Sequence, residues 1–302
     1  MLDFSKIKTI SIKQRKNKVR LNDLIKPEDS KVLINSKDFD GLIEKIIQAH
    51  KNKKQVILMM GAHMIKVGMS LLIIDLMKKG VIKHIAMNGA GPIHDFELAL
   101  IGETSEYAER TIEDGTFGMI EETGSILNEA IKEGAENNDG FGHAVGKKIN
   151  DLNLPNKEYS ILYNAYKLNI PATVHVAIGT DVIHQHPSCN GADVGKTSYQ
   201  DFKIFTESVS KLENGVILNT GCAVILPEVF LKALTIARNL GFKVKNITAA
   251  NFDMIDHYRP KENVVKRPTS LGGKGFIIID KHEKTIPSLH RKIVDGIVNC
   301  GE

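Results

Sequence analysis

The chain has 302 residues, of which 42% are hydrophobic and 25% are charged, a composition typical of a globular protein. The net charge is only +4, and the basic stretch at residues 6–20 has few aromatic residues beside it, so we expect no nucleic-acid partner. No apolar run approaches the roughly 20 residues that a membrane helix needs, so we expect no membrane partner either.

The cysteines indicate a compartment rather than a disulfide framework. Cys189, Cys222 and Cys300 form no CxxC pair, a usage typical of a reducing environment. The N-terminal residues also lack the apolar segment of a secretory signal. We therefore expect a cytoplasmic protein.

Residues 1–50 are predicted to form an N-terminal arm and a helix, followed by a single domain at 51–302. The first elements expected in that domain are a strand at 56–60, a helix at 64–79, a strand at 84–88 and a helix at 94–101. The strands are short apolar runs that end at glycine or asparagine, and the helices have apolar residues at helical spacing. Residues 104–153 are acidic and helical in pattern, which predicts a helical flank packed on the sheet.

The second half repeats this alternation of strands and helices. The expected elements are strands at 172–177 and 215–219, a helix at 228–240, strands at 244–249 and 275–280, and a helix at 287–298. Strands that are apolar on both faces and alternate with helices favour a parallel sheet covered on both sides. The predicted fold is α/β, with a doubly wound, mainly parallel, Rossmann-like sheet.

Ligands of open α/β sheets bind outside the carboxyl ends of the strands. Small residues follow four of the predicted strands, and glycine lets the backbone come close to a phosphate. These strand ends favour a nucleotide-type ligand, although none contains a GxGxxG or P-loop motif.

Acid–base residues lie beside these strand ends. His94, Asp95 and Glu97 begin a predicted helix, where they could act in catalysis or simply stabilise the helix dipole. Asp181 and Asp253 each follow a predicted strand, where a carboxylate could bind a ribose hydroxyl or a cationic amine.

Histidines follow Asp181 closely. His184 and His186 form an HxH pair, but the sequence shows no further ligand cluster at metal spacing, so we expect no metal site. Hydrogen bonding to a small molecule is the favoured role for both, and His63 after the first strand is assigned the same role.

Taken together, these segments resemble the deoxyhypusine synthase family from about Val56 onward. The turns at 59–68 and 86–95 resemble the family's first two nucleotide-contacting turns. Asn169-Ile-Pro171 with residues 177–181 resembles its Asn-Ile-Pro and Thr-Asp-Gly-Ser passage, and residues 215–253 resemble its glycine-rich strand end, helix and following strand. The order and approximate spacing of the motifs agree.

The resemblance implies an NAD-dependent homotetramer that oxidises spermidine and transfers its aminobutyl group through a lysine imine to a protein lysine. The cofactor-binding residues that it implies are Gly61, Ala62, Asn88, Gly89, Ala90, Gly91, Thr220, Gly221 and Ala249. The position that best matches the imine-forming lysine holds isoleucine in the strand at 275–280, and Lys274 precedes that strand.

The leading hypothesis is therefore a deoxyhypusine synthase-like transferase that acts on a polyamine or a similar small amine. Its expected catalytic residues are His94, Asp181, His184 and Lys274, and its expected substrate-binding residues are His63, Asp95, Glu97, His186 and Asp253. Two alternatives stay open. One is a different enzyme on the same fold that uses His63, His184 and His186, and the other is a non-catalytic nucleotide-binding protein.

Overall fold

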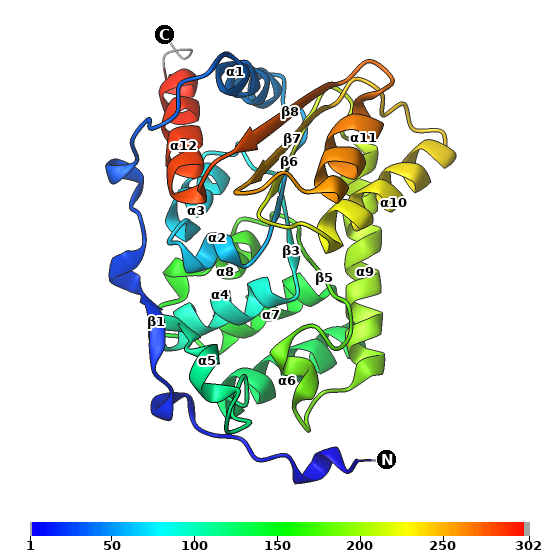
Figure 1. Cartoon of the computed structure of the whole chain (residues 1–302). Coiled ribbons are helices and arrows are strands. Elements are labelled where there is room, and N and C mark those ends of the chain that lie inside the picture. Colours follow the sequence, from blue (N-terminus) through cyan, green and yellow to red (C-terminus); the bar gives the residue numbers. More distant parts are fainter. Residues whose placement is uncertain (1, 299–302) are drawn as a thin grey trace.

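Six parallel strands form the central sheet of the computed structural model, which describes residues 2–298 (Figure 1). The strands, in spatial order, are β5 (Ala172–His175), β3 (His84–Asn88), β2 (Val56–Met60), β6 (Val216–Thr220), β7 (Thr248–Asp253) and β8 (Lys274–Ile279). Numbered along the chain, this order is 3-2-1-4-5-6, that of a dinucleotide-binding Rossmann sheet. The predicted doubly wound, parallel α/β fold is confirmed.

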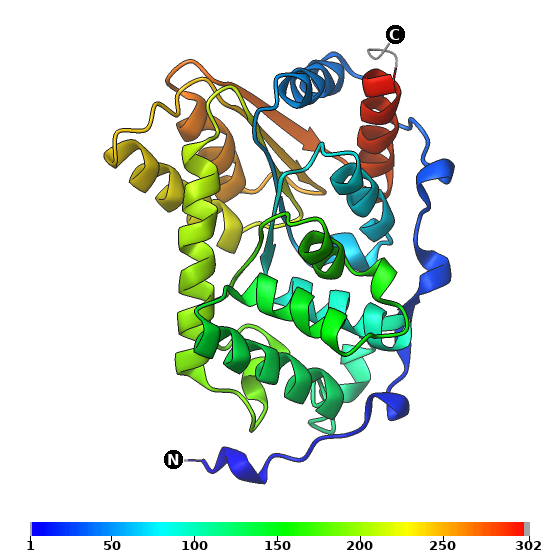
Figure 2. The same ribbon diagram turned by 180° about the vertical axis from the view of Figure 1, so that it is seen from behind.

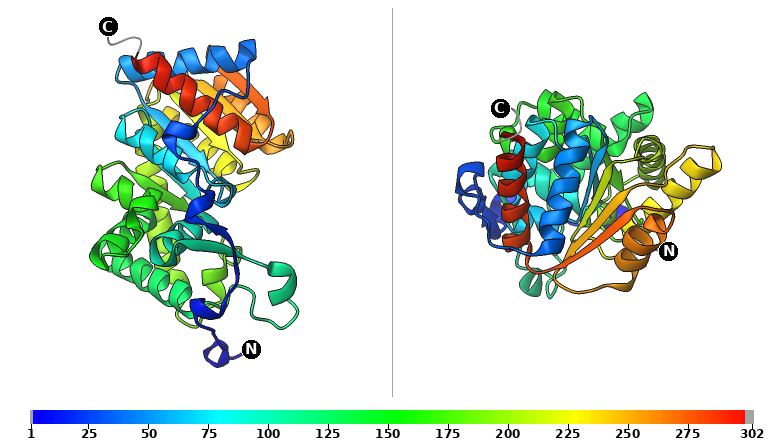
Figure 3. Two further views of the ribbon diagram at one scale, coloured as in Figure 1. Left: turned by 90° about the vertical axis from the view of Figure 1, so that its left-hand side faces the viewer. Right: turned by 90° about the horizontal axis from the view of Figure 1, so that it is seen from above.

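Helices cover both faces of the sheet. The longer helices are α1 (Lys37–Lys51), α3 (Ser70–Lys78), α4 (Ala90–Ile101), α6 (Glu121–Asn137), α7 (Phe141–Asp151), α8 (Ile161–Lys167), α9 (Gly191–Ser210), α10 (Ile225–Asn239) and α12 (His282–Val298). Figure 3 shows the sheet from above, between α1 and α12 on one side and α10 and α11 on the other. Figure 2 shows α6, α7 and α8, in green, stacked beside the long helix α9.

Short elements connect these helices and strands. They are the helices α2 (His63–Lys66), α5 (Ala108–Thr111) and α11 (Arg267–Thr269), the 3-10 turns η1 (Phe4–Lys6), η2 (Ile12–Gln14), η3 (Leu21–Asp23), η4 (Pro27–Asp29), η5 (Lys157–Tyr159) and η6 (Val182–Gln185), and the π-helical segment η7 (Pro260–Lys266).

The sheet is buried because its central strands are apolar on both faces. All five residues of β2 and of β6 are buried, and each face packs on its own apolar cluster. Phe39, Leu72 and Ile286 of α1, α3 and α12 belong to one cluster, whereas Phe205 and Phe230 of α9 and α10 belong to the other.

The N-terminal arm is fixed to the domain. Its strand β1 (Asn17–Arg20) pairs antiparallel with β4 (Glu103–Glu106), and Ile10 forms an isolated bridge with Ile120. The dark blue arm in Figure 3 runs along the whole length of the domain. It thereby brings the basic stretch at residues 6–20 close to the carboxyl edge of the sheet.

Several predicted boundaries shift. The predicted helix at 64–79 is split into α2 and α3, because Gly68 adopts a left-handed conformation with φ of 82°. The predicted flank at 104–153 begins as strand β4, and the strand expected at 244–249 starts at Thr248 instead.

Candidate functional site

A cavity of about 280 Å³ opens beside the carboxyl ends of β3 and β5. His94 and Glu97 of α4 line it together with Asp181, which follows β5. The cavity is also lined by three further charged side chains: Arg15 of the N-terminal arm, Lys66 of α2 and Glu106 of β4. Three of the predicted catalytic and substrate-binding residues therefore meet in one cavity.

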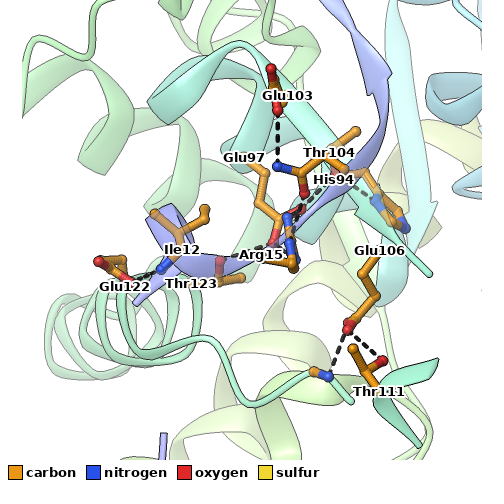
Figure 4. A network of polar contacts seen from close by, with 12 residues as sticks. Ile12, Arg15, His94, Glu97, Glu103, Thr104, Glu106, Thr111, Glu122 and Thr123 are labelled. Atoms are coloured by element: carbon orange, nitrogen blue, oxygen red, sulfur yellow. Dashed lines mark hydrogen bonds and ion pairs between the residues drawn. The ribbon is translucent and has the colours of Figure 1, made fainter. Parts of the chain in front are cut away.

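Glu97 is the centre of a buried polar network (Figure 4). The Arg15 guanidinium holds both of its oxygens, at 2.8 Å from Nη1 to Oε1 and 2.7 Å from Nη2 to Oε2. The hydroxyls of Thr104 and Thr123 donate to Oε2 and Oε1 at 2.6 and 2.9 Å. Burial alone would raise the pKa of Glu97, but the hydrogen bonds and charge of Arg15 hold this pKa below its ordinary value.

The network fixes the tautomer of His94. Thr104 uses its single hydroxyl proton on Glu97, so its oxygen must accept the 2.8 Å hydrogen bond from Nδ1 of His94. Burial lowers the pKa of His94 to about 4, so the imidazole is neutral at pH 7. Its Nε2 therefore carries a lone pair with no partner among the described residues, and the ring offers this hydrogen-bond acceptor to the cavity.

Asp181 presents a carboxylate to the same cavity. Burial raises its pKa to about 6, with the hydroxyl of Thr180 opposing the shift from 3.3 Å. The carboxylate lies where a side chain on Gly89 would be, since a Cβ there would come within 2.0 Å of Oδ2. Gly89, expected to face a cofactor, thus makes room for Asp181.

His184 stabilises the loop that carries Asp181. Its Nδ1 accepts hydrogen bonds from the backbone N–H groups of Gly179 and Asp181 at 3.2 and 3.3 Å. Burial lowers the pKa of His184, and its Nε2 is buried without a partner among the described residues. The ring positions Asp181 and does not line the cavity.

A second group of residues lies where the strand order reverses, between β2 and β6. Gly61 and Gly221 approach so closely that a Cβ on Gly61 would come within 2.1 Å of the Gly221 carbonyl oxygen. The ring of His63 lies 5.8 Å from that of His282, which is fully buried with neither ring nitrogen hydrogen-bonded within the described chain. Asp253, at the carboxyl end of β7, is close enough to oppose the lowering of the His282 pKa by burial.

This reversal point is where Rossmann sheets bind dinucleotides. The residues there fit such a group in two respects. Gly61 and Ala62 follow β2 as small residues, and the buried Oδ1 of Asn88 at the end of β3 has no partner in the described part of the chain. Thr220 fits less well, because its hydroxyl already donates to the Met59 carbonyl at 3.1 Å.

Two predicted substrate-binding residues lie elsewhere. Asp95 caps α8, accepting hydrogen bonds from the Ser160 hydroxyl and from backbone N–H groups of that helix. His186 is buried, and its Nε2 contacts the Gly118 carbonyl at 2.9 Å. The interpretation of both residues as substrate-binding groups does not agree with these contacts.

Ala249 and Lys274 lie away from the carboxyl edge of the sheet where the cavity opens. Ala249 is the second residue of β7 and is fully buried between Ile217 and Gly275, because the strand starts later than expected. Lys274 begins β8, so it lies at the amino edge of the sheet, with its ammonium over the Phe276 ring at 5.0 Å. Within one chain it does not reach the cavity. Of the other cofactor candidates, Ala90 lines the cavity and Gly91 packs on Met87.

Sequence reasoning missed Arg15, Lys66 and His282. Arg15 belongs to a basic run in which no residue stands out, and its partner Glu97 is 82 positions away. Lys66 falls in a turn whose pattern indicated only nucleotide contact. His282 follows β8, and the rule that placed the other candidates at strand ends could have found it.

Residues 2–298 lack two features that would bear on function. No group of three or more His, Cys, Asp or Glu side chains there could hold a metal ion. No helix in that range combines the length and the apolar character needed to cross a membrane.

Comparison with known proteins gives similarity at the level of the fold. No known protein-family profile and no curated protein sequence matches the chain. A LOR/SDH protein from Methanococcus maripaludis is 15% identical with a TM-score of 0.52, over 92% of this chain and 74% of that one. A protein described as a deoxyhypusine synthase, from Entamoeba histolytica, is 12% identical with a TM-score of 0.50, over 85% and 87% of the two chains.

A third solved structure holds ligands. AgrE, in a ternary complex with ornithine and NAD+, is 10% identical with a TM-score of 0.51 over 88% of this chain. The chain spans only 34% of the length of AgrE. At these identities, the three structures show that the chain shares their fold.

Proposed function

We propose that this protein is an NAD-dependent enzyme that acts on a small cationic amine bound in the His94 cavity. The observation that carries the proposal is the cavity itself, where a neutral imidazole with a free Nε2 and an ionisable carboxylate, Asp181, share about 280 Å³. The strand order supports a dinucleotide beside it, and so does the NAD+ bound by AgrE on a similar fold.

Each side chain has a defined task in this proposal. Asp181 is mainly ionised at pH 7, since its pKa is about 6, and it binds the ammonium group of the substrate. His94 accepts a proton from the substrate nitrogen at Nε2, while Thr104 holds Nδ1. Glu97, held by Arg15, accepts the hydrogen bond from the Thr104 hydroxyl and so keeps that hydroxyl oriented.

Gly61, Ala62, Asn88 and Gly221 would hold the NAD at the reversal point of the sheet. When bound, NAD supplies an acceptor for the hydride on the carbon next to the substrate nitrogen. The buried, unpartnered Oδ1 of Asn88 would gain a hydrogen-bond partner in such a complex.

Aminobutyl transfer from a polyamine is the specific form of this activity that the deoxyhypusine synthase resemblance implies. Lys274 does not support a lysine imine within one chain, because it begins β8 at the amino edge of the sheet. Mass spectrometry of spermidine after incubation with the protein and NAD+ tests this form directly. A dehydrogenated or transferred product supports the polyamine reaction.

The broader proposal is tested by thermal shift with NAD+, NADH and ADP-ribose, each with and without an amine. A ligand at a hundred times its Kd stabilises the fold by about 2.7 kcal/mol. For 302 residues, with an unfolding entropy of about 0.6 kcal/mol/K in total, this raises Tm by about 4 °C. The absence of a shift with every nucleotide would contradict the proposal.

The alternative enzyme built on His63, His184 and His186 has less support. None of these three histidines lines the cavity, and the rings of His184 and His186 are engaged with backbone groups. We therefore keep the His94 cavity as the proposed site.

A further inference from the structure

The cavity contains a cation without an ion-pair partner. Lys66, at the end of α2, lines the cavity and forms no ion pair or side-chain hydrogen bond with any described residue. Its charge contributes to the lowering of the His94 pKa, so the ammonium lies near the imidazole. Arg15 differs, because both of its outer nitrogens are engaged by Glu97. Lys66 is thus the cation of the cavity that is available to a ligand.

The carboxylates of the cavity also differ in whether they are already engaged by neighbouring groups. Glu97 is neutralised by Arg15. Glu106 accepts hydrogen bonds from the Thr111 hydroxyl and the Gly118 N–H, both at 2.9 Å, and so holds the loop between them. Asp181 accepts a 3.3 Å hydrogen bond from its neighbour Thr180, and its Oδ2 lies 3.9 Å from Nδ1 of His184, but burial lowers the pKa of that histidine and so disfavours its charged form. One negative and one positive group therefore remain available in the same cavity.

We infer that the substrate carries a carboxylate as well as an amine, with the carboxylate bound by Lys66 and the ammonium bound by Asp181. This inference rests on the proposed function and narrows its substrate class to small amino carboxylic acids. A monoanionic carboxylate balances one lysine, whereas a phosphate dianion would add a second negative charge beside Asp181, Glu97 and Glu106. A polyamine has no carboxylate, so its second ammonium group would lie near the ammonium group of Lys66.

The cavity size agrees with a small zwitterion. Its volume of about 280 Å³ lies just below the range of about 300–1,000 Å³ for small-molecule pockets, so it suits a small ligand. Lys66 itself is exposed, so it lies at the entrance, whereas Asp181 is buried. The expected orientation places the amine inside, beside His94, and the carboxylate toward solvent.

Two compounds that differ by one carboxylate test the inference. Ornithine is 1,4-diaminobutane with a carboxylate added, and the affinity of each is measured by calorimetry on the full chain at saturating NAD+. We expect ornithine to bind at least about tenfold more tightly. Lys66→Met should abolish this preference, whereas Lys243→Met, which removes an exposed lysine outside the cavity, should retain it.

The outcomes separate this inference from the proposed function. The inference would be overturned if 1,4-diaminobutane or spermidine bound as tightly as ornithine or more tightly, and if Lys66→Met did not change this order. That result would leave the proposed amine site intact. Tighter binding of phosphoethanolamine than of ornithine, or a borohydride-trapped imine on Lys66, would also overturn it. Failure of NAD+ and of every amine to bind would refute both proposals.

Discussion

Replacing Arg15 by methionine tests the buried network most directly. The Arg15 and Glu97 side chains are 5% and 1% exposed, so the substitution leaves a carboxylate buried with only two threonine hydroxyls. Breaking a buried ion pair from one side costs about 3–5 kcal/mol. With about 0.6 kcal/mol/K of unfolding entropy for 302 residues, Tm should fall by about 5–8 °C.

Urea unfolding at several pH values measures this loss. Glu97 has a lowered pKa in the wild type, so the stability from its ion pair is present above the unfolded pKa and is lost as pH falls through the folded pKa. In Arg15→Met the buried carboxylate is destabilising when ionised, so acid relieves it. The difference in the free energy of unfolding between the wild type and Arg15→Met should therefore become smaller toward pH 4.

Two controls sharpen the measurement. Arg20→Met removes an exposed ion pair with Glu103 at 3.4 Å and should cost at most about 1 kcal/mol. Adding Glu97→Gln to Arg15→Met should recover much of the loss, because the uncompensated buried charge disappears. A loss below about 1 kcal/mol in Arg15→Met, or a difference that does not depend on pH, would refute the reasoning.

The site and its surroundings lead to four further predictions. Gly89→Ala should weaken amine binding at least about tenfold in calorimetry. The added Cβ would lie only 2.0 Å from Oδ2 of Asp181, so the carboxylate would have to move. An unchanged affinity would count against Asp181 as the amine ligand. Wild-type affinity for the amine should also decline below pH 6 as that carboxylate gains a proton. Thr104→Val should give a mixture of His94 tautomers in nitrogen NMR, whereas Thr104→Ser should keep the single Nδ1–H form. Burial raises the pKa of Asp201 to about 8, so the contribution of this residue to stability is fully present at low pH and is lost as pH rises toward 8; Asp201→Asn should remove that part of the decline in urea unfolding between pH 5 and 8.5.

The central strands could be predicted because their signal is local. Residues 56–60 and 84–88 are apolar on both faces and end at glycine or asparagine, and β2 and β3 have these same bounds. The strand expected at 244–249 was displaced because Val244 and Ile247 are buried and apolar although they lie outside β7. Apolar character alone does not distinguish a strand from a buried connection.

The candidate site was predicted only in part, because its contacts are distant in sequence. His94, Glu97 and Asp181 follow strands whose carboxyl ends share an edge, and that rule was sufficient to bring them together. The polar strands β1 and β4 pair residues that lie 83 to 89 positions apart, from Arg20 with Glu103 to Asn17 with Glu106. Neither strand has an apolar periodicity that would indicate it. The capping role of Asp95 depends on α8, which begins 66 residues later.

The position of the arm has a consequence for how the protein is made. Residues 10–20 leave the ribosome before their partners do, because the partners of Arg15 and of the Ile12 N–H lie 82 and 110 residues further along the chain. Closing loops of that length has an entropic cost that must be met before the contacts form. The arm is therefore expected to dock after α4 and α6 have folded, as one of the last steps before the site is complete. Hydrogen exchange during refolding should then show late protection of β1 relative to β2 and β3.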